Sequence, residues 1–88
     1  MVTVNMGVPG FGNQKVSYAS MTETGKLKLN QHEITGIKAQ IANSINNRER
    51  ACLDEIVKDV QPANPGMTKD NIRDIVNQMW KADYISIH

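Results

Sequence analysis

The C-terminal stretch, residues 68–87, has the clearest hydrophobic pattern in the chain. Its apolar residues fall at i, i+3, i+4, i+7 and i+8: Ile72, Ile75, Val76, Met79 and Trp80. This spacing places them on one face of a helix. Thr68 precedes the pattern, and its hydroxyl can accept a hydrogen bond from a free N–H of the first turn. The pattern therefore predicts a helix over residues 68–82, with Trp80 in the core rather than in a stacking site.

A short run of strand-forming residues follows this helix. Residues 84–87 read Tyr-Ile-Ser-Ile, with Ile85 and Ile87 on the same face of a predicted strand. Because a lone strand of this length is unstable, it requires a partner within a sheet. We expect that partner at the N-terminal side of the chain.

Residues 15–29 predict a β-hairpin. Val16 and Tyr18 alternate with small residues, and the turn-forming sequence Thr-Glu-Thr-Gly follows at 22–25. Leu27 and Leu29 then alternate with two lysines, which would face solvent if the segment is a strand. This hairpin and the strand at 84–87 would form a small antiparallel sheet.

Two further helices are predicted between the hairpin and the C-terminal helix. Isoleucines at 34, 37, 41 and 45 predict a helix over 30–45, with Asn30 and Glu33 at capping-box spacing. A second apolar stripe predicts a helix over 47–60, which ends before Pro62 because the residue before a proline disfavours helical geometry. Residues 61–67 are the connector to the third helix.

The hydrophobic pattern therefore predicts one α+β domain, mainly α, over residues 15–88. Its core would hold three helices and a small antiparallel sheet. Residues 1–14 are rich in glycine, and we interpret them as a flexible N-terminal arm. Their GVPGFG run lacks the Gly-Lys-Ser/Thr ending of a nucleotide-binding loop, so it does not predict a phosphate site.

Composition narrows the classes of function. Ten lysines and arginines stand against nine acidic residues in 88, a net charge of +1, whereas proteins that depend on nonspecific phosphate contact are usually basic. Cys52 is the one cysteine, which precludes an internal disulfide, and its apolar setting predicts a buried, inert thiol.

No run approaches the ~20 apolar residues of a membrane span, and the N-terminus lacks the basic start of a secretory signal. We expect a cytoplasmic protein.

The sequence does not predict an enzyme. The two histidines, His32 and His88, have no second ligand at metal-binding spacing, and neither forms a credible dyad with Cys52. We therefore expect no catalytic site, no metal and no cofactor.

Residues 30–88 resemble a winged helix-turn-helix domain. The resemblance rests on the stripe Ile72, Ile75, Val76 and Met79, followed by the sequence Ala-Asp-Tyr-Ile at 82–85. It is similar to the end of a recognition helix that leads into a wing strand. The chain contains one strand after this helix, so the N-terminal segment would have to supply the rest of the wing.

The resemblance implies that the third helix presents its outer face to the major groove of DNA. Basic and amide side chains on the helix and nearby would then read bases or hold phosphates. They are Lys69, Asn71, Arg73, Asn77, Gln78 and Lys81 on the helix, with Arg48, Arg50, Lys26 and Lys28 elsewhere. Asp70 and Asp74 lie in the middle of the same face and would repel phosphate.

Two functions follow from these patterns. The first is a small DNA-binding accessory or regulatory protein, and the resemblance implies possible homodimerisation, for which the isoleucine face of helix 30–45 is a candidate surface. The alternative is a non-enzymatic protein-interaction module on the same scaffold, such as a virus- or mobile-element-encoded modulator of a host protein. Convergence of the basic residues on one face with helix 68–82 would favour DNA. Dominance of that face by Asp70 and Asp74 would favour a protein partner.

Overall fold

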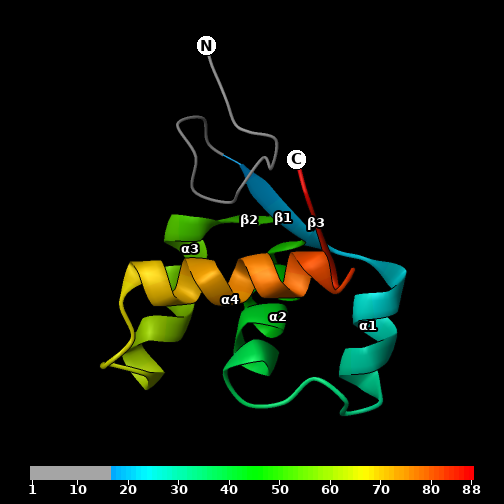
Figure 1. The fold of residues 1–88 in the computed structure, drawn as a ribbon, viewed down its shortest axis with the longest axis horizontal. Helices are drawn as coiled ribbons and strands as arrows, with labels where there is room; N and C mark the ends of the chain where they lie inside the picture. The colour runs from blue at the N-terminus through cyan, green and yellow to red at the C-terminus, as the bar shows by residue number, and fades with distance from the viewer. Residues whose placement is uncertain (1–16) are drawn as a thin grey trace.

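The computed structural model describes residues 17–88, so the predicted arm at 1–14 and the first two residues of the predicted hairpin lie outside the described part. Helices predominate, with one small antiparallel sheet, which confirms the α+β, mainly α class (Figure 1). In chain order the elements are β1 (Tyr18–Met21), α1 (Glu23–Asn30), α2 (Ile37–Arg48), β2 (Ala51–Cys52), α3 (Leu53–Val60), the 3-10 turn η1 (Gln61–Ala63), α4 (Lys69–Lys81) and β3 (Ile85–Ile87).

The sheet places β1 between β2 and β3, and both neighbours run antiparallel to it. Ala19 faces Ala51 of β2 on one side and Ile87 of β3 on the other. The strand at the N-terminal side therefore supplies the partner that the short C-terminal strand needs.

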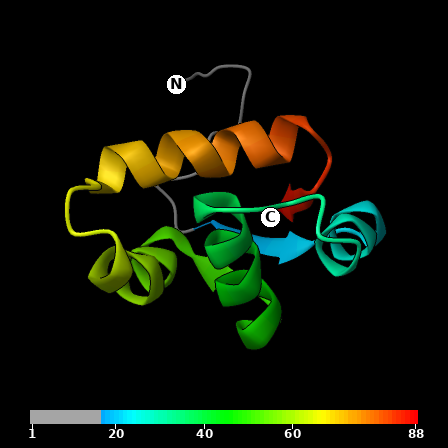
Figure 2. The same ribbon diagram turned by 90° about the horizontal axis from the view of Figure 1, so that it is seen from below.

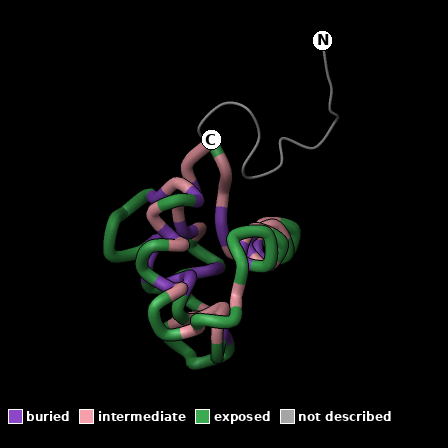
Figure 3. The backbone as a smooth tube through the Cα atoms, turned by 90° about the vertical axis from the view of Figure 1, so that its left-hand side faces the viewer, coloured by how far each residue is buried: buried purple, intermediate pink, exposed green. Residues whose placement is uncertain are grey.

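The core lies between the inner face of the sheet and helices α2, α3 and α4. Its buried residues are mainly isoleucine, valine, methionine and alanine, and Ser44 is the one buried polar residue among those described. In a view along its axis α4 lies at one side of the molecule and carries both buried and exposed residues (Figure 3); its buried residues are Ile72, Val76 and Met79. Of the isoleucines predicted to form a dimerisation surface, Ile41 and Ile45 are buried in this core, Ile34 is buried beside it and Ile37 is half-buried against it, so the row is not a free apolar surface.

The predicted hairpin at 15–29 is wrong after its first strand, because residues 23–30 form helix α1. Thr22 is the N-cap: its hydroxyl oxygen accepts a hydrogen bond from the Gly25 N–H at 2.9 Å and donates to the Asp83 carbonyl at 2.6 Å. The alternation of leucine and lysine at 26–29 is too short to exclude a helix, and capping decides the outcome. Leu27 is consequently exposed, at 54%.

The predicted helix 30–45 is shifted along the chain. Asn30 ends α1 instead of capping the next helix, and Gly36 is the N-cap of α2, with a φ of 66° that favours glycine. The helix then continues through the asparagine-rich run at 43–47 to Arg48. Those polar residues are poor helix formers, but burial of Ile41 and Ile45 outweighs their low propensity.

The predicted helix 47–60 begins six residues later, at Leu53. Glu49 adopts a positive φ of 68°, which ends α2 and lets residues 51–52 pair with β1. Cys52 then caps α3, and its backbone N–H donates to the Glu55 carboxylate at 3.0 Å. Cys52 is thus the half-buried N-cap residue of α3, not the buried core residue that its apolar neighbours predict.

The C-terminal prediction is confirmed. Thr68 caps α4 by accepting from the Asn71 N–H at 3.1 Å, and the Asn71 side chain accepts from the Thr68 N–H at 3.2 Å. Asp83, with a φ of 67°, turns the chain from α4 into β3. Seen from below, α4 and α2 cross between α1 at one end of the molecule and the α3–η1 corner at the other (Figure 2). Within residues 17–88, no helix has the length and apolar character needed to cross a bilayer.

Candidate functional site

The outer face of α4 is the surface for which the sequence predicts a binding role. Ile72, Val76 and Met79 are buried beneath it, so the remaining helix positions face outward. Most of its polar residues are exposed, whereas Arg73 and Asn77 are half-buried. The polar side chains of α4 are therefore accessible to a ligand. The electrostatic potential of this face depends on how its charged side chains are paired.

Two ion pairs neutralise cations of this face. Lys69 Nζ lies 2.7 Å from Asp54 Oδ1 on α3, and an Arg73 guanidinium nitrogen lies 3.3 Å from Asp70 Oδ1. Both acidic partners are at least three-quarters exposed, so each pair is weak and can exchange its cation. The carboxylates nevertheless remain on the surface when a pair opens. Asn71, a predicted base-reading residue, uses its side-chain oxygen to cap the helix.

The predicted basic residues on α1 and just before β2 have local partners or are exposed. Lys28 forms a 2.9 Å ion pair with Glu33, and this hydrogen-bonded carboxylate raises the pKa of Lys28 above its ordinary value. The Arg50 guanidinium stacks over the Tyr18 ring, 4.8 Å from its centroid. Lys26 is exposed on α1. Lys28 and Arg50 are therefore each engaged by a neighbouring side chain, which reduces the positive field that they offer to a ligand.

Arg48 is the most extensively paired cation among the described residues. Its guanidinium donates to both carboxylate oxygens of Asp59, at 2.8 and 2.9 Å, and to Glu55 at 3.2 Å. Ser44 Oγ also donates to Asp59, at 2.7 Å. Because both donors stabilise the carboxylate, they lower the pKa of Asp59 to about 2. Ser44 thus donates to a carboxylate that Arg48 already binds, and the three residues form a structural network. A carboxylate with so low a pKa is a poor general base for the serine hydroxyl.

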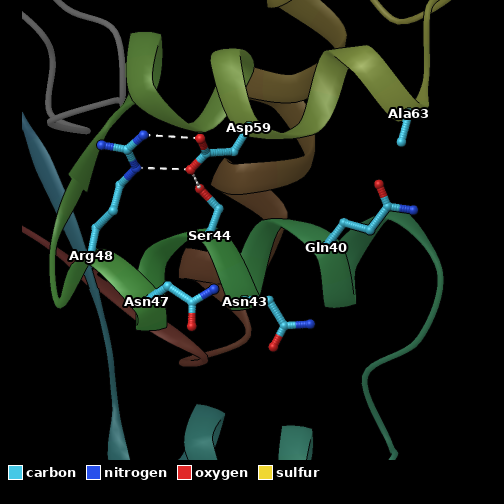
Figure 4. A pocket seen from close by; sticks show the side chains of 7 residues that line it. All are labelled: Gln40, Asn43, Ser44, Asn47, Arg48, Asp59 and Ala63. Carbon is cyan, nitrogen blue, oxygen red and sulfur yellow. Dashed lines mark hydrogen bonds and ion pairs between the residues drawn. The ribbon is translucent and has the colours of Figure 1, made fainter.

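This network forms the inner wall of an open groove between α2 and α3. The groove is shallow and open, with a volume of about 600 Å³, and is lined by Gln40, Asn43, Ser44, Asn47, Arg48, Asp59 and Ala63. Figure 4 shows Ser44 and Arg48 turned toward Asp59, with Asn43 and Asn47 beside them on α2. In the same view α4 passes behind α2 and α3, so the groove and the outer face of α4 lie on different sides of the molecule.

The sequence prediction does not include the groove amides. The signal that could have found them is their spacing, since Gln40, Asn43 and Asn47 stand at i, i+3 and i+7 on one helix. A helix boundary placed at residue 45 splits this row and hides it. The correct extent of α2 is therefore needed before the row can be recognised.

Of the ten residues predicted to bind nucleic acid, six lie on α4, Arg48 is bound to Asp59 between α2 and α3, and Lys26, Lys28 and Arg50 lie on α1 or just before β2. Within residues 17–88 it contains no cluster of three or more potential metal ligands. Comparisons with protein-family models, curated proteins and solved structures find no match to this chain.

Proposed function

We propose that this chain is a non-enzymatic protein-interaction module that presents the outer face of α4 to a protein partner. The charge balance of that face supports the proposal. Lys69, Arg73 and Lys81 stand against Asp70 and Asp74 on the helix itself, and Asp54 of α3 pairs with Lys69. A surface with interspersed charges of both signs is complementary to a protein surface of the same kind.

The same balance disfavours DNA. Duplex binding gains most of its nonspecific affinity when cations replace the counterions of phosphates, so it requires an excess of basic groups at the contact. An equal number of carboxylates on the face cancels that gain, and pairing of Arg48 and Lys28 with their own acids supplies no excess nearby. The single cysteine and the absence of an internal disulfide are in keeping with a module that acts in the cytoplasm.

DNA binding remains the second candidate because one observation favours it. The order α2, β2, α3, α4, β3 agrees with a winged helix-turn-helix domain up to its recognition helix and first wing strand. β1, from the N-terminal side, pairs with β3 where the wing would continue. On this hypothesis α4 would enter the major groove.

A DNA-binding assay separates the two candidates. Fluorescence anisotropy with a random-sequence 20-base-pair duplex, at salt concentrations from about 50 mM upward, would be measured for the natural chain and for the double variant Asp70→Asn/Asp74→Asn. If the carboxylates cancel phosphate binding, the natural chain does not bind and the variant gains binding that falls steeply with salt. Micromolar binding by the natural chain, lost in Lys69→Ala and Arg73→Ala, would overturn the proposal in favour of DNA.

Photo-crosslinking tests the protein partner directly. A benzoylphenylalanine in place of Gln78, exposed on α4, is compared in the source cells with the same group in place of Thr35, exposed on the α1–α2 loop. A nuclease-resistant protein adduct that forms from position 78, is absent from position 35 and is lost when Asp70 and Asp74 are both changed to lysine would support the proposal. A nuclease-sensitive adduct would contradict it.

A further inference from the structure

The outer face of the sheet gathers polar side chains that take no part in the core. Along β1, Tyr18 and Ser20 alternate with buried residues and therefore point away from the core. Ser86 of β3 stands directly opposite Ser20 and so shares its face. His88 exchanges two backbone hydrogen bonds with Tyr18, of 2.9 and 3.1 Å, which extends this row of polar residues across the sheet.

Arg50, which directly precedes β2, completes this face. Its guanidinium carbon lies 4.8 Å from the centroid of the Tyr18 ring, within the range of a cation–π contact. The guanidinium has no ion pair within the described part of the chain, and the adjacent Glu49 does not bind it. Arg50 is exposed and Tyr18 is half-buried. Together they offer a ligand a positioned ring and guanidinium rather than a strong positive field.

Hydrogen-bonding groups lie beside this stack. Ser20 Oγ and His88 Nε2 are 3.1 Å apart, and the Ser86 hydroxyl has no hydrogen bond to another residue among those described. A serine hydroxyl and an imidazole can each donate to a phosphate or sugar oxygen. None of these side chains is a carboxylate, whereas Asp70 and Asp74 lie on the outer face of α4.

These two sets of side chains match the two parts of a nucleotide. Aromatic rings and guanidinium planes stack on any base, and hydroxyl and imidazole groups bind the phosphate and sugar. A base within a duplex is already stacked, so the ligand has to be a single strand. A phosphopeptide would engage the hydrogen-bonding groups but supplies no base for the stack. Stacking also needs no large excess of positive charge, which agrees with the net charge of +1.

We propose that the outer face of the sheet binds a short segment of single-stranded nucleic acid. One base stacks on Tyr18 and Arg50, and the adjoining phosphate or sugar is held by the hydrogen-bonding groups next to them. These five residues form the sheet platform: Tyr18, Ser20, Arg50, Ser86 and His88. The platform contains no residue of α4 and does not depend on the function proposed for that helix.

Fluorescence anisotropy of a labelled oligothymidylate of about ten nucleotides, titrated with the purified full chain, tests the platform. Because stacking dominates and only one or two phosphates are contacted, log Kd should rise with log salt concentration at a slope of only about 0.7–1.4. An abasic oligomer with the same phosphates should bind at least about tenfold more weakly. Equal binding of the abasic oligomer, or tighter binding of a phosphoserine peptide, would overturn the proposal.

Variants of the stack separate stacking from net charge. Tyr18→Ala should weaken binding by about tenfold or more, whereas Tyr18→Phe keeps the ring and should bind as the natural chain does. Arg50→Gln should weaken binding about fivefold. Lys26→Gln is its matched control, because it removes one exposed positive charge from α1 and should leave Kd unchanged. Equal losses in Arg50→Gln and Lys26→Gln would contradict a specific platform.

NMR then locates the oligomer on the protein. In a nitrogen–proton spectrum it should shift the Nε–H signal of Arg50 and the amide signals of Tyr18, Ser20 and Ser86, while the amides of α4 stay in place. Shifts confined to α4, or no binding of the oligomer at about 50 mM salt, would overturn the proposal. Neither result would decide the protein partner proposed for α4, which the crosslinking experiment tests separately.

Discussion

Substitution of Gly25 by alanine tests how α1 is attached to the rest of the molecule. Gly25 lies in the first turn of α1, directly against the backbone that enters β3. A Cβ at this position would overlap the Tyr84 carbonyl oxygen and lie 2.8 Å from the carbonyl carbon, with the Met21 methyl at 3.0 Å. Backbone atoms cannot rotate away as a flexible side chain can. The alanine variant must therefore move α1 away from residue 84.

The expected cost can be estimated from the contacts that such a movement breaks. Overpacking a filled site costs about 1–3 kcal/mol. Displacement of α1 also loses the hydrogen bonds from Thr22 to the Asp83 and Tyr84 carbonyls, each worth about 1 kcal/mol. The better helix propensity of alanine returns about 1 kcal/mol. We expect the free energy of unfolding to fall by about 2–4 kcal/mol, and Tm by about 10–30 °C for a domain of this size.

Thermal and urea unfolding, followed by circular dichroism, measure this loss. Gly66→Ala is the control, because a Cβ at Gly66 meets nothing within 4 Å and Gly66 has no positive φ. It should leave Tm unchanged or raise it slightly, since alanine restricts the unfolded chain. Equal stability of Gly25→Ala and the natural chain would refute the close approach of α1 to residue 84.

Two further predictions concern the Asp59 network and the cap of α4. Because the pKa of Asp59 is lowered from 3.8 to about 2 in the folded state, its carboxylate stabilises the fold above pH ~4, and this stability is lost as the pH falls toward 2. Tm of Asp59→Asn should therefore be lower at neutral pH and change less than that of the natural chain over this interval; parallel Tm–pH curves would contradict the assignment. Thr68→Ala removes the N-cap of α4 and should lower the free energy of unfolding by about 0.5–2 kcal/mol in urea titrations. Thr35→Ala, in an exposed loop, should have no comparable effect, and a Thr68 variant as stable as this control would refute the role of the cap.

The C-terminal helix and strand could be predicted because their signals are local and repeated. The apolar stripe of α4 extends over more than two turns, its cap precedes it directly, and burial of Ile72, Val76 and Met79 agrees with the pattern. Local preference and tertiary packing thus favour the same structure. The secondary structure of a segment can be predicted from the sequence when these two influences agree.

The segment 22–30 could not be predicted for the opposite reason. Its leucine–lysine alternation covers only four residues, and the glycine that suggests a turn is required by contact with Tyr84, about sixty residues away. β2 has only two residues and therefore carries no periodicity. In both places the structure is decided by contacts between distant parts of the chain, which no local pattern contains.

In the candidate site, too, local features could be predicted from the sequence, whereas contacts between distant residues could not. The exposed face of α4 follows from the helix prediction alone, but the partners of its cations do not: Lys69 pairs with Asp54, fifteen residues earlier, across two helices. The same holds for Arg48 and Asp59, which meet only because α2 packs against α3. A count of basic residues therefore overstates the positive surface, since a cation held by an acid contributes little field beyond the pair.

This pairing also bears on how the molecule would recognise the partner proposed for it. With charges balanced locally, long-range attraction provides little orientation, and selectivity has to come from groups in contact. On α4 those groups are charges of alternating sign, whose pairing depends on register with an opposing surface. The Arg48–Asp59 network lies on the other side of α2 and α3 from this face, so it fixes the packing of the helices without occupying the surface proposed for the partner (Figures 1 and 4).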